Sequence, residues 1–110
     1  MSSPEHPAHW PDPVVDTYDS VLAESPGLAG AAFSTLVEAC ELLASAYALD
    51  KVAADANYVS TGSTGQTTAH PCLVEARLAR TEASRILGRL IVPANRGQAL
   101  ARARHGGLTR

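Results

Sequence analysis

Alanine is the residue that most constrains how this chain folds. It accounts for 20 of the 110 residues, whereas large side chains are few: one Trp, one Phe, one Met and three Tyr. Alanine favours helices and lets them approach closely, but it buries little surface. At about 25 cal/mol per Å² of buried apolar surface, the core of a single copy is thin. We therefore expect one helical domain that completes its core by self-association; the alternative is an ordinary small domain with close alanine packing.

Apolar periodicity predicts two helices in the first half of the chain. Asp12 and Pro13 fit the N-cap and first position of a short helix, which Ser25-Pro26-Gly27 ends. A longer helix is expected from about 28 to 56, with Asn57 as its stop. Its apolar stripe, at spacings of three and four residues, consists of Phe33, Leu36, Cys40, Leu43 and Tyr47.

The second half predicts a short β-hairpin followed by helix. β-favouring residues at 58–61 and 66–68 flank a glycine-containing turn. His70-Pro71 begins a helix, which Val92-Pro93 breaks; a last helical piece follows from about 94 to 104, and His105-Gly106-Gly107 stops it. The expected fold class is mainly α: a long antiparallel helical hairpin with a short β-hairpin-like loop. Residues 1–11 are expected to be a flexible segment, 12–104 a single helical domain and 105–110 a flexible tail.

Charge divides the chain into an acidic front and a basic end. Eight arginines lie beyond residue 76 against one acid, Glu82, whereas ten acids and a single base, Lys51, precede that point. A block of arginine indicates a polyanionic partner, most commonly phosphate, which suits the guanidinium fork. The alternative is a solvated helix face, or ion pairs with acids such as Glu38, Glu41 or Asp55. The predicted DNA-binding residues are Arg77, Arg85, Arg89, Arg96, Arg102 and Arg104.

No catalytic, nucleotide or metal site is predicted. The glycines at 62–65 are not followed by the lysine of a phosphate-binding loop. His6 and His9 have no partner carboxylate, and no base or oxyanion hole gathers around Cys40 or Cys72. These cysteines are interpreted as small buried apolar residues in a reducing compartment. We expect a protein that is not an enzyme and that carries no cofactor and no metal.

The sequence predicts neither a targeting signal nor a helix-turn-helix motif that would read a DNA sequence. No stretch is expected to be long or apolar enough to span a bilayer, and the first ten residues lack the basic and apolar parts of a secretory signal. A helix-turn-helix reader needs two helices joined by a short turn, whereas residues 58–69 separate the main helices here.

The order of these features resembles the compact small terminase subunits of tailed bacteriophages. Trp10 precedes a short helix, a long alanine-rich helix and a GSTGQ loop follow, and His70-Pro71 begins an arginine-rich helix. Near its end, Leu90, Pro93 and Arg96 match the terminal signature of that family, whereas residues 91–92 and 94–95 depart from it. The resemblance covers about residues 10 to 100.

The resemblance implies a packaging adaptor in the host cytoplasm. It implies a homo-oligomeric ring of helical hairpins that binds double-stranded viral DNA and regulates the large terminase subunit, with no membrane partner. The second hypothesis is a small helical oligomeric regulator or scaffold whose arginines make protein contacts only. The hairpin and oligomer core would consist of Leu36, Cys40, Leu43, Tyr47, Leu87 and Leu90.

Overall fold

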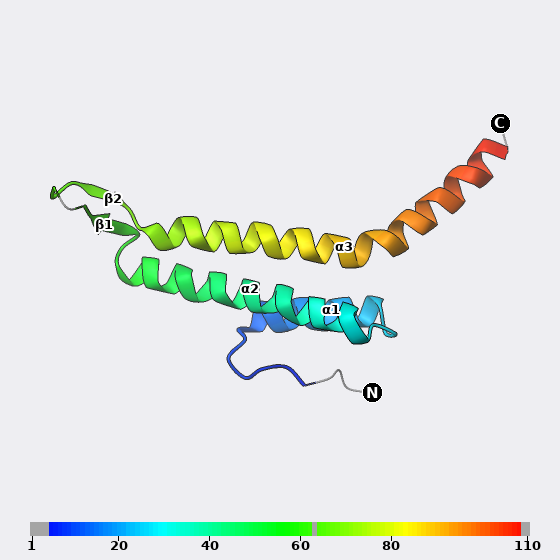
Figure 1. Cartoon of the computed structure of the whole chain (residues 1–110), viewed down its shortest axis with the longest axis horizontal. Helices are drawn as coiled ribbons and strands as arrows, with labels where there is room; N and C mark the ends of the chain where they lie inside the picture. Colours follow the sequence, from blue (N-terminus) through cyan, green and yellow to red (C-terminus); the bar gives the residue numbers. More distant parts are fainter. Residues whose placement is uncertain (1–4, 63, 109–110) are drawn as a thin grey trace.

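The computed structural model describes the backbone of residues 5–62 and 64–108 and the side chains of residues 5–62 and 64–90. Over this range the chain is mainly helical, as the sequence predicted, with a small two-stranded sheet (Figure 1). Helix α1 spans Asp12–Glu24, helix α2 spans Gly30–Asp55 and helix α3 spans Pro71–Leu108. Strands β1 (Val59–Thr61) and β2 (Thr67–Ala69) lie between α2 and α3.

Helix α1 begins one residue earlier than expected, at Asp12 instead of Pro13. Pro11 is the N-cap, so Asp12 is already in the first turn and the prediction of Asp12 as N-cap is wrong. There its carboxylate is close to the positive end of the helix dipole. The helix ends at Glu24, and Ser25 caps it by donating its backbone N–H to the carbonyl of Val21, which confirms the predicted stop.

The end of α2 and the β-hairpin confirm the sequence predictions. Asn57 and Tyr58 follow the helix with φ of 57° and 65°, a left-handed conformation that ends helices. The backbone N–H of Tyr58 donates to the carbonyl of Ala53 at 2.7 Å. Strand β1 then pairs antiparallel with β2, with Val59 opposite Ala69.

Helix α3 begins as predicted but does not end as predicted. Its first residue is Pro71, and His70 Nδ1 accepts a hydrogen bond from the backbone N–H of Cys72 at 3.1 Å. The break expected after Val92-Pro93 is wrong, and so is the stop at 105–107, because α3 continues to Leu108. An interior proline removes one backbone hydrogen bond, which a helix accommodates by bending rather than ending.

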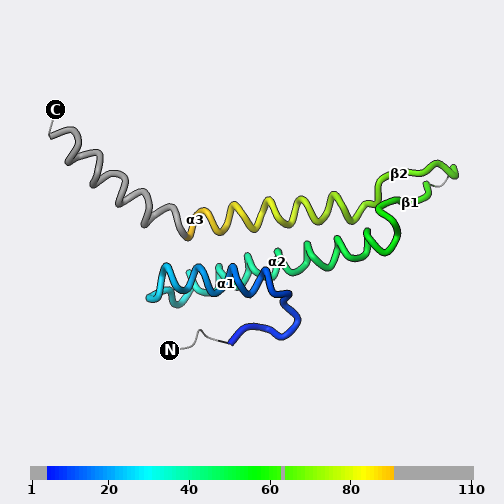
Figure 2. The backbone as a smooth tube through the Cα atoms, turned by 180° about the vertical axis from the view of Figure 1, so that it is seen from behind, coloured from blue at the N-terminus to red at the C-terminus, as the bar shows by residue number. Residues whose placement is uncertain are grey.

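Helix α2 packs against both other helices. Helices α2 and α3 lie side by side and run in opposite directions, and α1 lies against the first half of α2 (Figures 1 and 2). Five buried alanines recur every seven residues, three along α2 and two along α3. A seven-residue spacing keeps side chains on one helix face, and small side chains there let two helices approach closely. We call these residues the alanine seam: Ala39, Ala46, Ala53, Ala76 and Ala83.

The larger core side chains gather where α1 meets α2. Trp10 is only 4% exposed, and its ring meets Tyr18 edge-on with the centroids 5.2 Å apart. The indole Nε1 donates to the Glu41 carboxylate on α2. Its Oε1 also lies 3.1 Å from His9 Nε2, so the expectation that His9 has no partner carboxylate is wrong. The part of the expected flexible segment that contains His9 and Trp10 therefore contacts α2. This core cluster consists of Trp10, Val14, Tyr18, Val21, Leu36, Cys40 and Ala44.

The expectation that no stretch is long and apolar enough to span a bilayer is wrong. Helix α2 is long and apolar enough to cross a bilayer, and 28% of its most apolar window is buried within the chain. The core helix of a protein outside the membrane meets the same criterion. Since α2 packs against α1 and α3, its composition is weak evidence for a membrane span.

The alanine seam predicts that a larger side chain at its centre destabilises the fold. We expect Ala46→Leu to lower the free energy of unfolding by about 1–3 kcal/mol, because Ala46 is fully buried and a larger side chain overpacks such a position. Ala48→Leu, at an exposed position of the same helix, is the matched control and is expected to change it by less than about 0.5 kcal/mol. Urea unfolding followed by circular dichroism measures both; equal effects would contradict close packing at the seam.

Candidate nucleic-acid interface

The predicted DNA-binding arginines all belong to α3. The structure describes the side chains of Arg77, Arg85 and Arg89, whereas those of Arg96, Arg102 and Arg104 lie outside the described residues. Among the three described side chains, Arg85 already has an acidic partner, whereas Arg77 and Arg89 are exposed and have none among the described residues.

Arg77 and Arg89 are the exposed arginines with no acidic partner among the described side chains. They are twelve residues apart, which corresponds to about 18 Å along the helix axis, so they would contact separate phosphates. Two of the acids considered as alternative partners, Glu41 and Asp55, already bond within the chain: Glu41 to Trp10, and Asp55 to Lys51 at 3.4 Å. Arg77 and Arg89 therefore form the described part of the candidate interface.

Arg85 is engaged by its own helix. Its Nε lies 3.0 Å from Oε2 of Glu82 and its Nη2 lies 2.7 Å from Oε1, a pair three residues apart on one helix. Both side chains are largely solvated, so the pair contributes little to stability. It does neutralise the guanidinium, which makes Arg85 a weaker candidate for phosphate than Arg77 and Arg89.

Arg80 has a structural role that the sequence analysis missed. It donates to the Asp50 carboxylate on α2, and its guanidinium carbon lies 5.1 Å from the ring centroid of Tyr47. An ion pair and a cation–π contact thus link α2 to α3. Spacing was the available signal, since Arg80 stands seven residues before Leu87, on the side of α3 that faces α2.

Some residues of the predicted oligomer core are buried within the chain, and others are partly or largely exposed. Leu36 and Cys40 are fully buried against α1, and Tyr47 is exposed at the edge of the α2–α3 contact. Leu43, Leu87 and Leu90 are half-buried and pack against the core cluster. A role in assembly stays a prediction for these residues.

The two cysteines differ in their surroundings. Cys40 is inaccessible, and burial, followed by the charge of Glu41, raises the pKa of its thiol to about 11. Cys72 is half-buried beside His70. Burial, followed by the charges of Asp19 and Cys40, also raises the pKa of Tyr18. Within the residues described, no group of three or more His, Cys, Asp or Glu side chains could hold a metal ion.

Comparison with protein-family models, with curated proteins and with solved structures gives no match to this chain.

The cysteine environments predict different reactivity and a pH dependence. We expect iodoacetamide to modify Cys72 in the folded chain and Cys40 only after denaturation. In the unfolded chain the Cys40 thiol ionises near its ordinary pKa of 9.0, and in the folded chain near 11. Deprotonation therefore favours unfolding, so the stability present below pH 9 is lost as the pH rises towards 11.

The free energy of unfolding, measured by urea titration between pH 8 and 11, tests this second expectation. Cys40→Ala should reduce the fall, and Cys72→Ala should leave it unchanged. Rapid modification of Cys40 in the folded chain would contradict its burial.

Proposed function

We propose that this chain is a non-enzymatic adaptor that binds double-stranded DNA and assembles into a closed ring, as the resemblance to small terminase subunits implies. The observation that carries the proposal is the exposure of Arg77 and Arg89 on α3 without acidic partners among the described side chains. The same helix continues with Arg96, Arg102 and Arg104, and Glu82 is the one acid beyond residue 76. On this proposal the chain acts in the host cytoplasm and docks the large terminase subunit.

Ring assembly multiplies weak contacts. Each copy contributes two described arginines, and a ring repeats them around one surface, so individually weak phosphate contacts add up. Binding that depends on phosphate contacts weakens steeply as salt rises, because each contact releases a counterion.

The shape of the chain supports assembly through an antiparallel α2–α3 hairpin. Its radius of gyration is 19.2 Å, against about 13 Å for a compact domain of this length. The large apolar side chains that remain exposed in the described region all fall in the part of the chain that α1 does not cover, between residues 47 and 78. Contacts between copies would remove these side chains from water. They are Tyr47, Val52, Tyr58, Val59, Val74 and Leu78.

A second candidate function is supported by a different observation. Arg80 and Arg85 both make ion pairs with protein carboxylates. A helical oligomeric regulator or scaffold would use its arginines in this way, for protein contacts only. The two candidates differ in whether DNA binds.

We expect the double substitution Arg77→Ala/Arg89→Ala to weaken DNA binding and to reduce its dependence on salt. Each phosphate contact removed should lower the slope of log affinity against log salt by about 1, which is about 2 per bound chain. Fluorescence anisotropy with a labelled DNA duplex at several salt concentrations measures both quantities. Lys51→Ala is the matched control, since Lys51 is an exposed base already paired with Asp55.

Unchanged affinity and slope in the double variant would remove both arginines from the interface. A wild-type chain that does not bind DNA even at low salt would favour the regulator or scaffold instead.

A separate variant tests the part of the interface predicted from sequence alone. We expect Arg102→Ala/Arg104→Ala to weaken DNA binding and to lower the salt slope by a similar amount. Full retention of binding in the same anisotropy experiment would exclude these two residues.

A further inference from the structure

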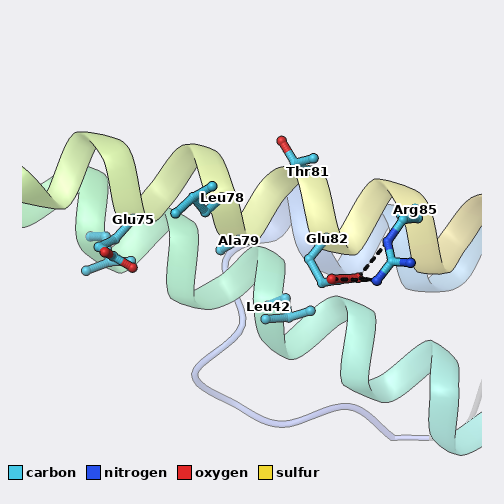
Figure 3. Close-up of a pocket in the computed structure, with 8 residues that line it drawn as sticks. Leu42, Glu75, Leu78, Ala79, Thr81, Glu82 and Arg85 are labelled. Carbon is cyan, nitrogen blue, oxygen red and sulfur yellow. Dashed lines mark hydrogen bonds and ion pairs between the residues drawn. The ribbon is translucent and has the colours of Figure 1, made fainter.

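An open groove runs between α2 and α3, and DNA binding by the arginines gives it no role. Its volume is about 500 Å³. From α2 it is lined by Leu42 and Leu49, and at its edge Leu78 of α3 is 53% exposed (Figure 3). The residues of α3 that line it are Glu75, Leu78, Ala79, Thr81, Glu82 and Arg85.

The groove lies on the side of the molecule that α1 leaves open. Cys40 and Ala44 of α2 belong to the core cluster with α1, whereas Leu42 and Leu49 line the groove. At 3.6 residues per turn, Leu42 is rotated about 200° from Cys40 around the helix axis. Since α1 does not reach this face, its leucines remain available to another molecule.

The α3 side of the groove is symmetric about position 80. Glu75 and Arg85 are each five residues from that point, Leu78 and Glu82 are each two away, and Ala79 and Thr81 flank it. Reversing the direction of the helix therefore exchanges Glu75 with Arg85. Their positions are ten residues apart, about 15 Å along the axis. A surface with this property is complementary in charge to a second copy of itself.

We propose that this groove is a two-fold self-association surface, on which α3 of one chain lies antiparallel to α3 of a second copy. Glu75 of each chain then meets Arg85 of the other, so that two equivalent ion pairs form. Among the described side chains Glu75 has no ion pair within its own chain, and the five N–H donors of Arg85 allow it to bind Glu82 and a second carboxylate together. In this register Leu78 of each chain lies opposite Glu82 of the other, next to the small Ala79 and Thr81 side chains, which permit close approach.

This pairing does not depend on DNA binding and holds for either candidate function. Ring closure uses head-to-tail contacts between different patches, whereas a two-fold contact uses the same patch twice. The groove therefore adds a second kind of interface. Assemblies that use it contain an even number of chains.

Substitution of Leu78 tests the apolar part of the surface. We expect Leu78→Asp to weaken the pairing at least about tenfold and to halve the number of chains in the assembly, because it places a charge at the centre of the contact. Native mass spectrometry and sedimentation of the full chain measure this number. Ala48→Asp is the matched control: Ala48 is also exposed, but it lies on α2 outside the groove. Circular dichroism verifies that each variant is folded.

Charge exchange tests the antiparallel register. Glu75→Arg and Arg85→Glu should each weaken association, because each places like charges opposite one another in the pair. Mixing the two variants should restore it, since every contact in the mixed pair again joins opposite charges. The same sedimentation measurement detects the restored species.

The results separate this inference from the proposed function. Pairing that is lost in Leu78→Asp and restored by mixing the charge variants supports the two-fold surface, whether or not the wild-type chain binds DNA. An odd number of chains in the wild-type assembly, equal association of Leu78→Asp and wild type, or no restoration on mixing would overturn it.

Discussion

Close contact between α2 and α3 at the alanine seam is the constraint on which the rest of the structure depends. Side chains as small as alanine contribute little buried surface each, but they let two long helices lie against each other over many turns. The link between Arg80 and Asp50, with Tyr47 beside it, adds a polar contact across the same pair of helices. The position of α3, and with it the placement of Arg77 and Arg89 on the exposed surface, follows from this packing.

A core built on small residues leaves surface uncovered. The large core side chains are concentrated where Trp10 and Tyr18 meet α2. Helix α1 therefore covers one half of the α2–α3 pair and leaves the other half exposed. The exposed apolar residues belong to that other half, and the groove beside Leu78 lies on the face of α2 that α1 leaves open. The thin core and the exposed apolar surface thus have a single cause, the distribution of large side chains along the chain.

Local signals in the sequence were sufficient for most of the fold. The stop at Asn57, the two short strands and the start at Pro71 each depend on the conformational preference of one or two residues, and each is confirmed. Pro93 was misinterpreted as a break. Whether a proline ends a helix depends on whether the rest of the helix is stable enough to offset one lost backbone hydrogen bond, and the local sequence does not show this. The partners of Arg80 and Trp10 lie about thirty residues away, so only the folded structure identified them.

We propose that this chain, with its arginine-rich α3 and thin core, binds DNA as an assembly of several copies. Native mass spectrometry of the full chain, alone and with a short DNA duplex at low ionic strength, tests that claim most directly. The account predicts a defined species of several copies that gains the mass of the duplex; a single copy that remains free of DNA would contradict it.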